Sequence, residues 1–179
     1  MKFYIAQGIG FIGMALVFAA FQQNDKRRIL WVQALGAVVF AAHFLLLGAL
    51  TGMCMNLLEI PRNLVFAHEH KKQRQILWTV VFIAFFMVLG IFTWESPMSL
   101  FPIGAMSLST VAFSLRKPRH IRLCSLPVSA LWLTYNILSW SIAGALTESF
   151  CLLSILIAIA RFDILSKRTL TAQSPGGDF

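Results

Sequence analysis

Charged residues are scarce in this sequence. Asp, Glu, Lys and Arg make up 12% of its 179 residues and hydrophobic residues 58%, whereas a soluble domain carries roughly 25% charged residues. A chain with so little charge cannot coat a globule with water-compatible side chains. The composition therefore excludes an ordinary soluble domain and predicts an integral membrane protein whose main partner is the lipid bilayer.

Motifs for metal, redox and hydrolytic chemistry are also missing. The three cysteines, Cys54, Cys124 and Cys151, lie in apolar segments with no Cys-x-x-Cys or Cys/His metal spacing. No G-x-S-x-G, H-E-x-x-H or P-loop pattern occurs. We therefore expect no metal, no cofactor and no enzymatic activity, although an intramembrane acid–base set of His43, Glu59 and Glu148 stays open as a minor alternative.

Seven apolar runs are long enough to cross the hydrocarbon as helices, which takes about 20 residues. In lipid the backbone must satisfy its own hydrogen bonds, and the alternating ten-residue strands of a barrel are not seen. The sequence predicts an all-α protein with transmembrane helices at 3–21, 29–47, 50–67, 76–94, 98–115, 121–139 and 141–160.

The net charge of +8 does not indicate a nucleic-acid partner, because the basic residues form short clusters between apolar runs. Thirteen of the fifteen Lys and Arg residues fall on one side of a seven-span layout, and basic loops stay cytoplasmic. We expect the N-terminus outside and the C-terminus in the cytoplasm. The thirteen are Lys26, Arg27, Arg28, Lys71, Lys72, Arg74, Arg116, Lys117, Arg119, Arg122, Arg161, Lys167 and Arg168.

The two halves of the chain share a layout of span, basic loop, span, short turn and span. At an offset of 92 residues, Gly52 falls on Gly144 and Asn56 on Glu148. One extra span separates the halves, so they have the same orientation, as in parallel-repeat transporters. The sequence predicts a first three-helix repeat at 1–67, a linker span at 68–97, a second repeat at 98–165 and a disordered cytoplasmic tail at 166–179.

A family resemblance rests on three stretches. They are Phe21-Gln22-Gln23-Asn24-Asp25-Lys26-Arg27-Arg28, the span with His43-Phe44-Leu45-Leu46-Leu47-Gly48-Ala49-Leu50-Thr51-Gly52, and the span with Arg62-Asn63-Leu64-Val65-Phe66. Over about residues 5–163 the chain resembles the YgjV-type bacterial inner membrane proteins, fold-level relatives of the SWEET, PQ-loop and nicotinamide riboside transporters. The resemblance implies a SWEET-like 3+1+3 helix plan, an inner-membrane location and transport of a small solute.

Ionisable groups inside spans are costly, so each is a functional candidate. Glu59 and Arg62 are three residues apart and can form an intramembrane ion pair. That pair either locks its span in the bundle or handles substrate or protons. Glu148 has no obvious partner in the sequence and either enters a pocket, where it could take up a proton, or reaches the outer interface. The resemblance implies that Asn56 and Glu148 line a central pocket.

The sixth span carries Trp132, Tyr135, Asn136 and Ser139 at helical spacing, which is typical of an aromatic pocket wall with polar handles. His43 matches Tyr135 in the repeat and either shuttles protons or packs. We expect an unidentified small-molecule substrate to bind Asn56, Glu148, His43, Tyr135, Asn136 and Trp132. The competing hypothesis is a non-transporting receptor, accessory or lipid-binding protein, and homo-oligomer formation stays open.

Overall fold

A computed structural model describes the chain except for residues 24, 116–117 and 161–179, so the predicted tail lies outside the described residues. Within them the protein is all-helical, and the seven predicted helices are present. They are α1 (Lys2–Phe21), α2 (Lys26–Leu47), α3 (Leu50–His68), α4 (Lys72–Phe92), α5 (Leu100–Ser114), α6 (Pro118–Leu138) and α7 (Ile142–Ala158), with a 3₁₀ turn η1 (Pro97–Ser99) before α5.

Five of these helices are long and apolar enough to cross a membrane: α1, α2, α4, α6 and the segment Pro97–Ser114 that joins η1 to α5. Helix α7 is apolar but shorter, with 17 residues in its described part. Helix α3 is not among the five, and it carries the polar run Asn56, Glu59, Arg62 and Asn63.

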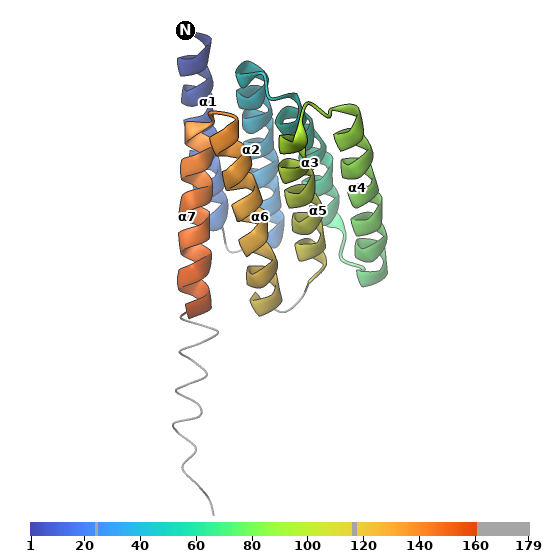
Figure 1. The fold of residues 1–179 in the computed structure, drawn as a ribbon. Helices are drawn as coiled ribbons and strands as arrows, with labels where there is room; N and C mark the ends of the chain where they lie inside the picture. Colours follow the sequence, from blue (N-terminus) through green and yellow to red (C-terminus); the bar gives the residue numbers. More distant parts are fainter. Residues whose placement is uncertain (24, 116–117, 161–179) are drawn as a thin grey trace, which may run out of the picture.

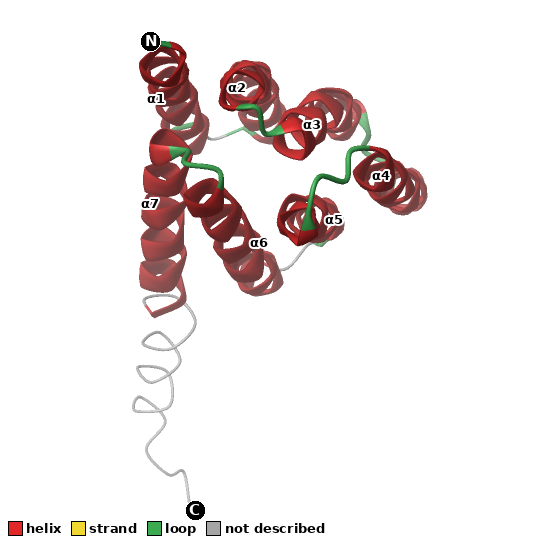
Figure 2. Ribbon diagram, turned by 45° about the horizontal axis from the view of Figure 1, so that its top comes forward, coloured by secondary structure: helices red, strands yellow, loops and turns green. Residues whose placement is uncertain are grey.

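Six helices form a closed ring. Helices α1, α2 and α3 pack in sequence, as do α5, α6 and α7, and the ring closes where α1 meets α7 and α3 meets α5. Helix α4 lies outside the ring against α3 and α5, as Figure 2 shows. The predicted linker span therefore packs beside the ring and is not one of its walls.

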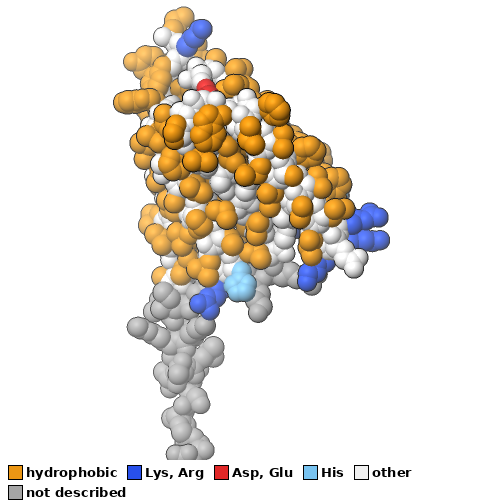
Figure 3. All heavy atoms as spheres, turned by 45° about the vertical axis from the view of Figure 1, so that its right-hand side comes forward, with side chains coloured by type: hydrophobic (Ala, Val, Ile, Leu, Met, Phe, Trp, Pro, Cys, Tyr) orange, Lys and Arg blue, Asp and Glu red, His pale blue; other side chains and the backbone are white. Residues whose placement is uncertain are grey.

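The two ends of the bundle differ in charge. Met1 and the connections α2–α3, α4–α5 and α6–α7 lie at one end, which we call the N-terminal end (Figure 1). The opposite end, here the basic end, holds the helix termini with the described clusters 26–28, 71–74 and 119–122. Basic side chains gather near that end in Figure 3, while hydrophobic side chains cover the flank. The apolar flank suits contact with lipid.

Local sequence signals set several helix boundaries. The Asp25 side chain accepts a hydrogen bond from the Arg28 amide and so caps α2. Gly48 ends α2 with φ of 76°, a left-handed conformation that glycine adopts without strain. Pro102, which could have kinked the fifth span, lies in the first turn of α5, where a helix tolerates proline.

Two close helix contacts depend on glycines of α1. A β-carbon on Gly10 would collide with His43 and Ala143, and one on Gly13 would press on Phe40. Gly8, Gly10 and Gly13 have the G-x-G-x-x-G spacing of dinucleotide-binding turns, but they lie inside a helix, so the spacing serves helix packing here.

Side chains from other parts of the ring cap the N-termini of α7 and α3. The cap of α7 comes from α1, and the cap of α3 comes from the connection before α5. The Gln7 side chain of α1 accepts hydrogen bonds from the Ile142 and Ala143 amides at 3.0 and 3.2 Å. The Glu95 carboxylate, in the connection before α5, accepts one from the Thr51 amide at 3.2 Å. Both caps lie at the N-terminal end and satisfy amides that a helix leaves unpaired.

Candidate functional site: a polar cavity inside the helix ring

A cavity of about 310 Å³ lies inside the ring. Helices α1, α2, α3, α5, α6 and α7 all contribute lining residues, whereas α4 contributes none. Small-molecule sites in proteins usually have volumes of about 300–1,000 Å³. The ring therefore encloses a space suited to a small solute, not to a macromolecule.

The cavity extends from the middle of the bundle toward the basic end. On that side its lining reaches Gln33 near the start of α2, Ser125 near the start of α6 and Ser154 near the end of described α7. In the other direction the lining stops at Phe44 on α2 and Asn136 on α6. A solute would therefore approach from the basic end.

An aromatic layer closes the cavity on the side of the N-terminal end. The rings of Phe44 and Trp132 stack at 6.0 Å, and Tyr135 lies 5.6 Å from Phe44 and 5.9 Å from Trp132 between ring centroids. Phe44 and Tyr135 are 2% and 3% exposed. The Phe44 and Trp132 rings, contributed by α2 and α6, line the cavity and form its floor, and Tyr135 packs behind them.

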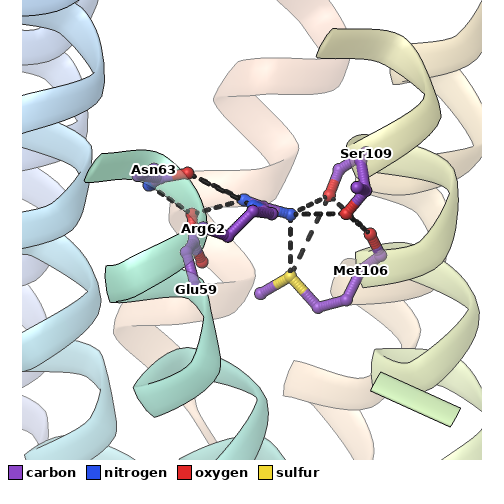
Figure 4. A network of polar contacts seen from close by, with 6 residues as sticks. Glu59, Arg62, Asn63, Met106 and Ser109 are labelled. Carbon is purple, nitrogen blue, oxygen red and sulfur yellow. Dashed lines mark hydrogen bonds and ion pairs between the residues drawn. The ribbon is translucent and has the colours of Figure 1, made fainter. Parts of the chain in front are cut away.

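Arg62 is fully engaged by protein partners (Figure 4). Its Nη1 donates to Ser109 Oγ at 2.6 Å and Thr110 Oγ1 at 3.2 Å, and its Nη2 donates to Glu59 Oε1 at 3.0 Å. Its Nε and Nη2 both donate to Asn63 Oδ1. A guanidinium has five N–H donors, and these five bonds use them all. Arg62 therefore ties α3 to α5 and has no donor left for a ligand.

Glu59 is only partly neutralised by this network. Its Oε1 accepts from Arg62 Nη2 and from Asn63 Nδ2 at 3.1 Å. No hydrogen bond to its Oε2 is found among the described residues, and the Glu59 side chain is 18% exposed. Because Glu59 also lines the cavity, one carboxylate oxygen remains free for other contacts.

Glu148 is the second carboxylate of the cavity and projects from α7. Ser129 of α6, which also lines the cavity, is the polar side chain that interacts with it. The ion pairs found in the described part of the chain, Glu59–Arg62 and Glu69–Arg74, do not include it. The charged lining residues are Glu59, Arg62 and Glu148, so the formal charge of the lining is −1.

Two further lining residues carry buried acceptors without a partner. The Oδ1 atom of Asn136 and the Oε1 atom of Gln33 are buried and make no hydrogen bond within the described structure. Asn136 is 3% exposed, and its Nδ2 donates to the Trp132 carbonyl at 2.8 Å. A buried polar group without a partner usually indicates a missing water or ligand.

The Asn136 side chain depends on a glycine in α7. Its amide lies directly against Gly144, where any β-carbon would overlap the Asn136 Oδ1 atom. Both residues line the cavity. Gly144 therefore allows the close approach of α6 and α7 at the end of the cavity nearest the N-terminal end.

His43 and Tyr135 are not among the lining residues. His43 is fully buried, with Nδ1 2.7 Å from the Ala6 carbonyl and Nε2 2.8 Å from Ser141 Oγ. The Tyr135 hydroxyl accepts from the Gly52 amide at 2.9 Å. Both side chains therefore join helices beyond the floor of the cavity. The structure brings together four of the six predicted binding residues, Asn56, Trp132, Asn136 and Glu148, with Glu59 and Arg62 beside them.

Sequence reasoning missed Gln33 and Ser129. The pocket face predicted on the sixth span begins at Trp132, but the lining face of α6 begins earlier and includes Ser125, Ser129, Trp132 and Asn136. These positions are three or four residues apart, as one helix face requires. Extending the helical spacing toward the start of the helix would have found Ser129.

Comparison with known proteins identifies relatives by sequence but none by solved structure. A family model described as Imp-YgjV, bacterial inner membrane protein, matches residues 4–165. The chain is similar to the inner membrane protein YgjV of Escherichia coli (strain K12), with 26% identity over 167 residues that cover 93% of this chain and 88% of that protein. No solved structure matches.

Proposed function

This chain belongs to the Imp-YgjV family of bacterial inner membrane proteins, and from that premise we propose that it is a transporter or facilitator of a small solute. As a family member it is a multi-pass protein of the inner membrane. The observation that carries the proposal is the cavity of about 310 Å³ inside a ring of six helices, lined by three charged side chains. Charged groups at membrane depth are expensive and mark solute or ion pathways.

The proposal includes seven transmembrane spans, with the basic end in the cytoplasm and the N-terminus outside. Support for this orientation comes from the described basic clusters at 26–28, 71–74 and 119–122, which share one end of the bundle. The cavity lining extends toward the same end. The state described here would thus be open to the cytoplasm.

A parallel repeat of two three-helix units is also part of the proposal. The ring closes in related ways, because the first helix of each half packs on the third helix of the other. At the offset of 92 residues the amide of Thr51 corresponds to that of Ala143. The Thr51 amide is capped by Glu95, just before the first helix of the second half, and the Ala143 amide by Gln7, in the first helix of the first half. Rocking of the two units would expose the cavity alternately to the two sides.

Cysteine labelling tests the proposal without knowledge of the substrate. Cys151 lines the cavity, so a Cys54→Ala/Cys124→Ala background leaves one native probe. A charged, membrane-impermeant thiol reagent should label Cys151 in inside-out vesicles and, more slowly, in intact cells, where it can enter only from outside. The matched control is Ser149→Cys with all native cysteines replaced, because Ser149 is exposed on the flank of α7 and should stay unlabelled in lipid.

A non-transporting receptor or accessory protein is the second candidate. The observation that favours it is the Arg62 network, which ties α3 to α5 with every guanidinium donor used. A fixed bundle would let the reagent reach Cys151 from the cytoplasmic side alone. Labelling of Cys151 in inside-out vesicles but not in intact cells would therefore contradict the transport proposal and support this alternative.

A further inference from the structure

We propose that the cavity binds a small organic monocation that carries N–H donors, with the Glu148 carboxylate as its counter-charge. This inference rests on the proposed function, since it assigns a substrate class to the same cavity. It stands on three independent features of the lining, namely its charge, its hydrogen-bonding groups and its aromatic floor.

The charge of the lining selects a cation. Glu59 and Arg62 form an ion pair at 3.0 Å, which leaves the Glu148 charge without a counter-ion among the described lining residues. The Glu148 side chain is partly buried, and a carboxylate taken out of water is unfavourable unless it is paired with a cation or takes up a proton. A monocation would bring the cavity to neutrality, whereas an anion would add a second unpaired charge and a neutral solute would leave Glu148 as it is.

The buried side-chain atoms of the lining that lack a hydrogen-bond partner within the described structure are both acceptors. Asn136 Oδ1 and Gln33 Oε1 are buried without a donor, and Glu59 Oε2 has no hydrogen bond among the described residues. The strongest donor group in the lining, the Arg62 guanidinium, has no free N–H. A ligand that satisfies this cavity must therefore supply N–H or O–H donors, and a quaternary ammonium group would not.

The aromatic floor fits the non-charged part of such a ligand. Phe44 and Trp132 present stacked rings beside Asn136 at the closed end of the cavity. Aromatic faces attract cations within about 6 Å of their centroids and also pack against apolar groups. One water occupies about 30 Å³ in the liquid, so the volume of about 310 Å³ holds roughly ten waters. A ligand of that size is one aromatic ring with a short cationic arm.

The experiment uses four probes of similar size and isothermal titration calorimetry on the detergent-purified full-length protein. Benzylguanidine is a cation at neutral pH and has N–H donors, and benzylurea is its neutral planar analogue. Benzyltrimethylammonium is a cation without N–H groups, and phenylacetate is an anion. We expect benzylguanidine to bind at least about tenfold more tightly than each of the others, a difference of about 1.4 kcal/mol.

Two variants locate the binding. Glu148→Gln keeps the shape of the side chain and should abolish the preference for benzylguanidine over benzylurea. Glu69→Gln removes the same charge in the connection between α3 and α4, outside the cavity, and should leave the preference unchanged. Equal binding of benzylguanidine and benzylurea to the unaltered protein, a preference for phenylacetate, or no binding of any probe at millimolar concentration would overturn the inference, and none of these results depends on the folding of a variant.

The two proposals fail separately. If Cys151 is labelled from both sides but benzylguanidine shows no preference, the cation assignment is wrong and the transport proposal stands. If benzylguanidine binds through Glu148 but Cys151 is labelled from one side alone, the cavity is a cation-binding site of a non-transporting protein.

Discussion

Replacing Arg62 by leucine should destabilise the protein strongly, because it leaves Glu59 inside the bundle without its counter-ion. Breaking a buried ion pair by removing one partner costs about 3–5 kcal/mol. The Glu59 side chain is 18% exposed toward the cavity, so water can solvate part of its charge, and we expect about 3 kcal/mol. Ser109 and Thr110 lose little, because both hydroxyls also donate to the Met106 carbonyl.

The double variant Glu59→Leu/Arg62→Leu separates this electrostatic cost from lost packing. Replacing both members of a buried pair by apolar residues of similar size is often neutral or stabilising. We therefore expect the double variant to lie within about 1 kcal/mol of the unaltered protein, although each single variant is far less stable. The pair Glu69–Arg74 at the basic end is the control, because its charged groups are 3.9 Å apart and the Arg74 side chain is 64% exposed. Arg74→Leu should therefore change stability by less than about 1 kcal/mol.

The assay is unfolding of the purified protein in mixed micelles of rising SDS content, followed by tryptophan fluorescence. The free energies of unfolding of the four proteins give a double-mutant cycle for the pair. If the loss in the double variant equals the sum of the losses in the two single variants, Glu59 and Arg62 do not interact, and the account of Arg62 as a saturated structural tie is wrong.

The remaining predictions use the same unfolding assay. Gly52→Ala should cost about 1–3 kcal/mol of stability, because the new methyl would collide with the Tyr135 ring. Gly8→Ala is the control, since a methyl there would have no neighbouring atom within 4 Å, and it should be neutral or slightly stabilising. Equal effects at the two sites would contradict this packing. Tyr135→Phe should cost about 1 kcal/mol, since the Gly52 amide loses its acceptor, and an unchanged stability would show that water replaces it. Gln7→Leu should cost about 1–2 kcal/mol by leaving two α7 amides unpaired, and a wild-type unfolding curve would refute the capping role.

The helices could be predicted from the sequence because apolar length is a strong signal in a chain with few charges. The predicted positions of the helix ends are less accurate. Helices α2 and α4 begin at Lys26 and Lys72, several residues before the predicted starts at 29 and 76. The prediction followed the apolar run, whereas a helix continues past the hydrocarbon wherever its first turn can be capped, as Asp25 does for α2.

The site was predictable in part. Asn56, Glu59 and Glu148 could be singled out because polar groups are costly within an apolar span. The roles of His43 and Tyr135 could not, because their hydrogen-bond partners Ser141 and Gly52 lie 98 and 83 residues away in the chain. Such contacts depend on how the ring closes, and neither helical spacing nor composition determines that.

Uptake of an organic cation by reconstituted protein tests the central claim most directly. Proteoliposomes with a potassium diffusion potential, negative inside, would be given radiolabelled benzylguanidine. A potential of 100 mV contributes about 2.3 kcal/mol per charge, which allows roughly fiftyfold accumulation. We expect saturable, potential-driven uptake by the unaltered protein and by Glu69→Gln, and none by Glu148→Gln. Uptake no faster than in protein-free liposomes, or uptake that Glu148→Gln leaves unchanged, would contradict a pathway for an organic cation through this cavity.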